Sequence, residues 1–111
     1  MPRDAAVYLD DILTAIARIR DYARGLDQAA FLRDSRTIDA VLRNLEVIGE
    51  AAKQVPLDVR ERAPQVEWRK IVGMRDFIAH AYFDVDLEIV WDVVSTKLAP
   101  LEEAVRALKS C

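Results

Sequence analysis

Residues 38–55 read IDAVLRNLEVIGEAAKQV, and this stretch decides the fold. Its apolar residues recur at steps of three and four, the spacing that lines one face of an α-helix. These residues are Ile38, Val41, Leu42, Leu45, Ile48, Ala52 and Val55. Pro56 follows directly, and proline does not continue a helix. The stretch therefore predicts a long helix with one apolar face, which other helices must cover.

The chain upstream of this helix predicts a second long helix over residues 4–24. One face of that segment carries an apolar stripe of Leu9, Ile12, Ile16 and Ile19. Gly25 suits the end of a helix, and Asp27 is a good cap for the next element. Residues 34–35 (Asp-Ser) either break that element into a short turn and a long helix or lie within one helix, and the spacing leaves both open.

Three further helices are expected downstream. A short connecting helix covers residues 57–62, and a longer one covers residues 66–82. Asp84 or Asp86 caps the last helix, which runs to the C-terminus with a kink at Pro100. Its heptad-like apolar stripe consists of Leu87, Val90, Trp91, Val94, Leu98, Leu101, Val105 and Leu108.

The predicted fold class is all-α. No segment alternates as a strand does, so residues 1–111 are expected to form one domain, an antiparallel bundle of four main helices plus the short connecting helix. Trp68 and Trp91 are interpreted as core anchors. The apolar stripes exceed what one small bundle buries, so a homodimer is also expected.

Composition excludes several classes of function. The 16 Lys and Arg against 19 Asp and Glu give a net charge of −3, which argues against a broad nucleic-acid surface but not against a local site. No apolar run approaches the roughly 20 residues of a membrane span, and the first residues lack a secretory signal. We therefore expect a cytoplasmic protein. Cys111 is the only cysteine, so neither an internal disulfide nor a cysteine zinc site is expected, and no cofactor is indicated.

The candidate site lies in residues 74–85, MRDFIAHAYFDV. This segment holds Arg75, the only histidine of the chain (His80), and Tyr82. At about 100° per residue, Arg75 and Tyr82 share a helix face, whereas His80 lies about 140° from Arg75. Three arrangements would bring them together: the helix ends or distorts near Ala79, long side chains bridge the angle, or a second copy of the chain completes the site.

These residue types suit metal-free RNA cleavage. That reaction needs a base that takes the 2′-OH proton and an acid that protonates the leaving 5′-oxygen. It also needs a positively charged group beside the phosphate, where negative charge develops in the phosphorane. Histidine, with an ordinary pKa near 6.5, suits both proton roles, and the arginine fork binds two phosphate oxygens. Because each chain has one histidine, either two copies supply two, or Tyr82 or water is the second group.

A purely structural interpretation of the same residues is also open. His80 would then be a satisfied side chain near a helix end, and Tyr82 would lie at a half-buried edge of the core. Glu46 and Glu50 are four residues apart and share a helix face. They would form a solvated acidic face, or one of them would pair with a buried Arg75.

Residues 75–82, RDFIAHAY, match the pattern Arg-x4-His-x-Tyr. This pattern resembles the motif of the HepT-like toxin ribonucleases of the HEPN superfamily. The likeness extends to residues 44–53 (NLEVIGEAAK), to residues 68–74 (WRKIVGM), and to residues 82–86 and 89–91 after the motif.

The resemblance implies an all-helical homodimer that acts as a metal-independent endoribonuclease toxin. It implies that Arg75 and His80 are catalytic. It also implies a minimal nucleotidyltransferase as the antitoxin, which silences the toxin by transferring AMP to Tyr82. Asp76 stands where the family often has asparagine or another polar residue, and its role is open: it either orients His80 or weakens RNA binding.

Two rival functions remain at this stage. The first is a non-catalytic helical dimer that binds a nucleotidyltransferase partner. The second is a plain structural bundle, in which substitutions of His80 and Tyr82 change only stability.

Overall fold

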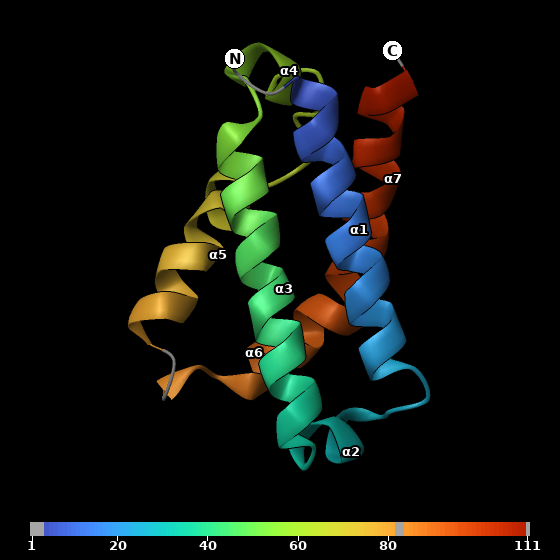
Figure 1. Ribbon diagram of the computed structural model, residues 1–111, viewed down its shortest axis with the longest axis vertical. Helices are drawn as coiled ribbons and strands as arrows, with labels where there is room; N and C mark the ends of the chain where they lie inside the picture. Colours follow the sequence, from blue (N-terminus) through green and yellow to red (C-terminus); the bar gives the residue numbers. More distant parts are fainter. Residues whose placement is uncertain (1–3, 82–83, 111) are drawn as a thin grey trace.

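Helices account for nearly all of the regular structure in the computed structural model, which describes residues 4–81 and 84–110 (Figure 1). These residues contain no strand, which confirms the all-α prediction. The elements are α1 (Ala5–Ala23), α2 (Gln28–Leu32), α3 (Ser35–Gln54), α4 (Leu57–Arg60), α5 (Trp68–His80), α6 (Leu87–Asp92), a π-helical turn (Val93–Lys97) and α7 (Leu98–Ser110). No helix within the described ranges is both long enough and apolar enough to cross a membrane.

Helix α3 is the centre of the bundle. It packs against α1 along one side and against α5 along the other, while α7 packs against α1 (Figure 1). The apolar face predicted for residues 38–55 is buried as expected, with Val41 and Ile48 fully inaccessible to solvent. The apolar stripe of α1 lies opposite and is also buried. The long helix at residues 38–55 therefore does organise the core.

The boundary between α2 and α3 shows which of the two open alternatives is right. The carboxylate of Asp34 accepts hydrogen bonds from the backbone N–H of Thr37 at 3.1 Å and from its hydroxyl at 2.8 Å. This is a helix N-cap, so the segment divides into a short α2 and a long α3. The same hydrogen bonds lower the pKa of Asp34.

The connection from α3 to α5 is fixed by a buried tryptophan. The indole Nε1 of Trp68 donates to the carbonyls of Arg60 and Ala63, both at 3.1 Å. Trp68 is buried, which confirms it as a core anchor. Helix α5 begins at this residue rather than at Val66, so the same anchor sets where the candidate motif starts.

The last helix is interrupted earlier than expected. Asp86, not Asp84, caps α6 by accepting from the N–H groups of residues 88 and 89. After α6 the chain widens into the π-helical turn Val93–Lys97, directly before α7 and Pro100. A proline ring clashes with the carbonyl four residues before it, and a wider turn relieves that clash. Trp91 packs on Phe31 of α2, with ring centroids 5.1 Å apart.

Candidate functional site

The candidate site begins with an unusually close approach of α3 and α5. A Cβ atom placed on Gly49 would lie 2.9 Å from the backbone nitrogen of Arg75 and 3.0 Å from the carbonyl oxygen of Ile71. Any side chain at this position would therefore collide with the α5 backbone. The glycine lets α5 lie directly on α3, with Arg75 next to the turn that carries Glu50.

Arg75 faces two carboxylates. Its Nε lies 3.4 Å from Oε2 of Glu50, and its Nη1 lies 3.1 Å from Oδ1 of Asp76. The side chains of Arg75 and Glu50 are 52% and 53% exposed. Of the two glutamates considered, Glu50 is therefore the one that pairs with Arg75, and Arg75 is not buried as the purely structural interpretation would have it. This geometry leaves the guanidinium accessible to a ligand.

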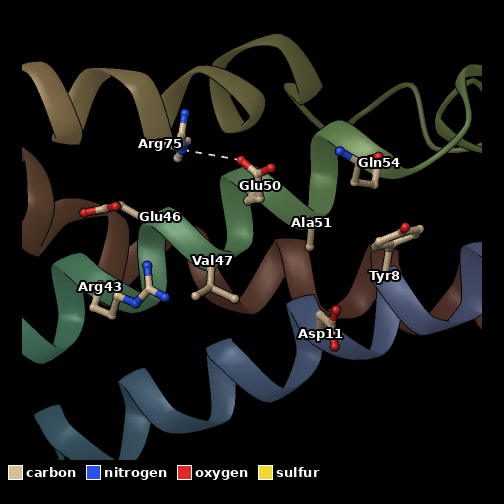
Figure 2. Close-up of a pocket in the computed structure, with 9 residues that line it drawn as sticks. All are labelled: Tyr8, Asp11, Arg43, Glu46, Val47, Glu50, Ala51, Gln54 and Arg75. Carbon is tan, nitrogen blue, oxygen red and sulfur yellow. Dashed lines mark ion pairs between the residues drawn. The ribbon is translucent and has the colours of Figure 1, made fainter. Parts of the chain in front are cut away.

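The Arg75–Glu50 pair borders a groove of about 300 Å³ between α1, α3 and α5 (Figure 2). Nine side chains line it: Tyr8, Asp11, Arg43, Glu46, Val47, Glu50, Ala51, Gln54 and Arg75. Glu46 and Glu50 both line the groove, in keeping with the shared helix face that their four-residue spacing predicted. Two arginines and three carboxylates thus meet in one hollow of mixed charge.

His80 is the last residue of α5 and is exposed. Its Nδ1 lies 2.7 Å from the backbone carbonyl oxygen of Asp76, one helical turn earlier. Because a carbonyl oxygen only accepts, we assign the proton to Nδ1, which donates to it. In the neutral ring Nε2 then carries a lone pair and is able to accept a proton.

Asp76 contacts both motif residues, through different atoms. Its carboxylate binds Arg75, and its carbonyl accepts from His80. Among the described residues no hydrogen bond or ion pair joins Arg75 to His80 directly, and His80 does not line the groove. The helix ends at His80, close to the Ala79 end point considered above. Tyr82 lies outside the described residues.

Arg43 was not singled out from the sequence, yet it lines the same groove as Arg75. The signal was present, because Arg43 is seven residues before Glu50 and so lies on the same face of α3. Within residues 4–81 and 84–110, no three His, Cys, Asp or Glu side chains gather closely enough to hold a metal ion.

The comparisons with known proteins agree on one family. The profile of the ribonuclease HepT-like family matches residues 12–108. A relative from Thermococcus cleftensis, named "Probable ribonuclease HepT", is 40% identical over 102 residues, which cover 92% of this chain and 93% of the relative. A relative from Methanocaldococcus jannaschii, named a "putative RNase", is 41% identical over 99 residues, which cover 88% of this chain and 82% of the relative. No solved structure matches significantly.

The matched region covers most of the chain, from within α1 to within α7, and so includes both α3 and α5. It confirms the resemblance inferred from residues 75–82 and agrees with the expectation of an endoribonuclease. The chain belongs to the ribonuclease HepT-like family.

Proposed function

We propose that the protein is a metal-independent endoribonuclease toxin in which Arg75 and His80 are the catalytic residues. One observation carries the proposal: the Arg75 guanidinium is accessible at the edge of a groove, while Nε2 of His80 on the same helix is left without a partner among the described residues. The ribonuclease HepT-like family membership supports RNA as the substrate.

In the proposed reaction, Nε2 of His80 takes the proton of a ribose 2′-OH. The 2′-oxygen attacks the adjacent phosphorus, the P–O5′ bond breaks, and an acid protonates the leaving 5′-oxygen. The products are a 2′,3′-cyclic phosphate and a 5′-OH. Arg75 stabilises the negative charge that builds up on the non-bridging oxygens in the transition state.

We propose a homodimer because one chain does not place His80 in the Arg75 groove. A second copy would supply a second His80. The histidine of one subunit would then act as the base and that of its partner as the acid. Phe77, between the two motif residues in sequence, is 56% exposed, and Ile89 is 59% exposed. An interface over these side chains would remove apolar surface from water.

Glu50 is proposed as a positioning residue that fixes the Arg75 side chain through its ion pair. Asp76 is proposed to orient the His80 ring through its backbone carbonyl rather than through its carboxylate. Glu46 lines the same groove but forms no ion pair with Arg75, and we propose that it shapes the charge of the groove. None of these three residues transfers a proton in this scheme.

The toxin role implies a neutralising partner, which we propose is a minimal nucleotidyltransferase. The phenolic oxygen of Tyr82 would attack the α-phosphorus of ATP and displace pyrophosphate, leaving AMP on the tyrosine. Tyr82 is two residues after His80, so the added phosphodiester would bring negative charge to the motif and repel substrate phosphate.

The test compares RNA cleavage by the parent protein, Arg75→Ala and His80→Ala in buffer that contains EDTA. Arg69→Ala is the matched control, because it removes an exposed arginine from the same helix. We expect the parent and Arg69→Ala to cleave RNA at similar rates. The cleavage rate of Arg75→Ala and of His80→Ala should fall at least 100-fold, the order expected when charge stabilisation or general acid–base catalysis is removed. Equal cleavage by all four proteins would reject the proposal.

The outcome also separates the rival functions. A parent protein that never cleaves RNA, but gains the mass of AMP at Tyr82 with a nucleotidyltransferase and ATP, would identify the non-catalytic binding dimer. If substitutions at His80 and Tyr82 altered only thermal stability, the plain structural bundle would be right.

A further inference from the structure

Arg43 is a cation whose position the nuclease reaction does not explain. It lies on α3, exposed to solvent, and lines the same groove as Arg75. Arg43 and Glu50 both line the groove along α3, and Figure 2 shows Arg75 directed toward Glu50 from α5. Arg43 is seven residues before Glu50, which corresponds to about 10.5 Å along the helix axis.

The two arginines of the groove differ in whether carboxylates form ion pairs with them. Arg75 has two carboxylate partners, Glu50 and Asp76. In the part of the chain that the structure describes, no carboxylate forms an ion pair with Arg43. Glu46 is only three residues away, but Figure 2 shows its carboxylate and the Arg43 guanidinium directed to different sides. Among the described residues Arg43 therefore presents a guanidinium fork without an ion-pair partner, in a groove that Asp11, Glu46 and Glu50 also line.

We infer that Arg43 binds a phosphate of the RNA that flanks the scissile phosphate; the inference rests on the proposed function of Arg75. Each strand of a stacked duplex places one phosphate about every 3.4 Å along the helix axis, and a stacked single strand is taken to have the same spacing. The distance of about 10.5 Å along the α3 axis between Arg43 and Glu50 is therefore spanned by roughly three nucleotides at most. The RNA backbone would run along α3 from Arg75 to Arg43, and the chain would hold a short strand rather than a lone phosphodiester.

This subsite would help to reconcile an acidic protein with an RNA substrate. The net charge of −3 opposes non-specific RNA binding. The groove also carries Asp11, Glu46 and Glu50, so the two guanidinium groups would act as discrete phosphate contacts rather than as a basic patch. Arg43 would thus favour substrates that carry a further phosphate on its side of the cleavage point.

The first experiment measures binding of a fluorescent single-stranded RNA oligonucleotide as a function of salt, with EDTA present and in a His80→Ala background that prevents cleavage. Each phosphate contact contributes about 0.7 to the slope of log K against log salt for single strands. We expect Arg43→Gln to lower that slope by about 0.7 and to weaken binding about fivefold at low salt, as for a partly exposed ion pair. Arg62→Gln, which removes an exposed arginine beyond α4, should change neither value.

The second experiment measures cleavage kinetics in the otherwise parental chain. Arg43→Gln should raise KM for an oligonucleotide and leave kcat unchanged. It should not alter kcat/KM for a dinucleoside monophosphate, which has only the scissile phosphate. Arg43→Lys keeps the charge and should restore most of the oligonucleotide KM. A merely structural role would affect both substrates alike and would lower the melting temperature relative to Arg62→Gln.

The outcomes separate this inference from the proposed function. If the parent cleaves RNA but Arg43→Gln keeps the full salt slope and KM, the subsite is rejected and the nuclease stands. If the parent binds RNA without cleaving it, and Arg43→Gln still lowers the slope, the nuclease fails while the phosphate contact stands. A parent that does not bind RNA at all rejects both. Weaker self-association of Arg43→Gln with unchanged RNA binding would make the groove a protein interface and overturn the inference.

Discussion

Gly49 of α3 lies so close to the backbone of Arg75 in α5 that a Cβ on Gly49 would be only 2.9 Å from the Arg75 nitrogen. No rotamer change relieves such a collision, because the obstructing atoms belong to a helix backbone. We expect Gly49→Ala to push the helices apart and to destabilise the protein by about 1–3 kcal/mol, as other over-packed substitutions do. Chemical denaturation measures the change in the free energy of unfolding.

Gly73→Ala is the matched control for this prediction. Gly73 also lies within α5, but a Cβ there meets no atom within 4 Å. Alanine restricts the unfolded chain and favours a helix over glycine by roughly 0.5–1 kcal/mol. We therefore expect Gly73→Ala to be neutral or stabilising. Two alanine variants with the same change in stability would contradict the close contact of α3 and α5.

Asp76→Asn should tighten RNA binding. The Asp76 carboxylate occupies the Arg75 guanidinium, so a substrate phosphate must compete with it, whereas the His80 ring is held by the backbone carbonyl that asparagine keeps. At about 1 kcal/mol for unit charges 4 Å apart in water, the gain should be about two- to fivefold in Kd at low salt. Fluorescence anisotropy checks it, with Glu88→Gln on α6 as a control for net charge. An unchanged Kd with a lower kcat would instead mean that the carboxylate orients His80.

Phe77→Asp should dissociate the proposed homodimer. Phe77 presents a large apolar side chain to solvent within the motif helix, and a buried aspartate in an apolar interface has no partner for its charge. Sedimentation velocity should show a dimer for the parent protein and a monomer for the variant. Leu57→Asp is the control, because Leu57 is 68% exposed on α4, at the other end of the bundle. A parent that sediments as a monomer would remove the shared-site proposal.

The helices could be predicted from the sequence because local signals and tertiary packing agree. The apolar stripe of residues 38–55 is buried, and Asp27 caps the element that it was expected to begin. The cap at Asp34 decides between the two alternatives that the spacing left open. The interruption before Pro100 was predicted one turn too late. A proline acts on the carbonyl four residues before it, and the spacing of apolar residues does not reveal where the preceding turn widens.

The site could be predicted only in part. A motif identifies residue types, so Arg75, His80 and Glu50 were available from the sequence. The exposure of these side chains could not be predicted, because it depends on how closely α5 approaches α3 at Gly49 and on how much of α5 the other helices leave uncovered. Arg43 was missed for a related reason: a single arginine on a helix face is ordinary until packing shows that it shares a groove with a second one.

The stability of the bundle should depend on pH through Glu102, which links α7 to α1. Its carboxylate accepts hydrogen bonds from Arg20 at 2.6 Å and from Arg106 at 3.2 Å. The hydrogen bond from Arg20 is the main cause that lowers the pKa of Glu102 below its ordinary value of 4.5. Since the folded state favours the ionised form, the stabilisation is complete above the ordinary pKa of glutamate and is lost as the pH falls through the lowered value.

Glu102→Gln should therefore destabilise the protein near pH 7 by about 0.5 kcal/mol, the size typical of exposed ion pairs. The difference from the parent should shrink as the pH falls below 4.5 and vanish once the carboxyl is protonated in both the folded and unfolded states. Urea titrations of parent and variant over this range measure it. Glu103→Gln, at a neighbouring position of α7 with no ion pair to another described residue, should leave stability unchanged throughout. If the parent and Glu102→Gln still differed by the same free energy of unfolding in acid, packing rather than charge would join α7 to α1 at this point.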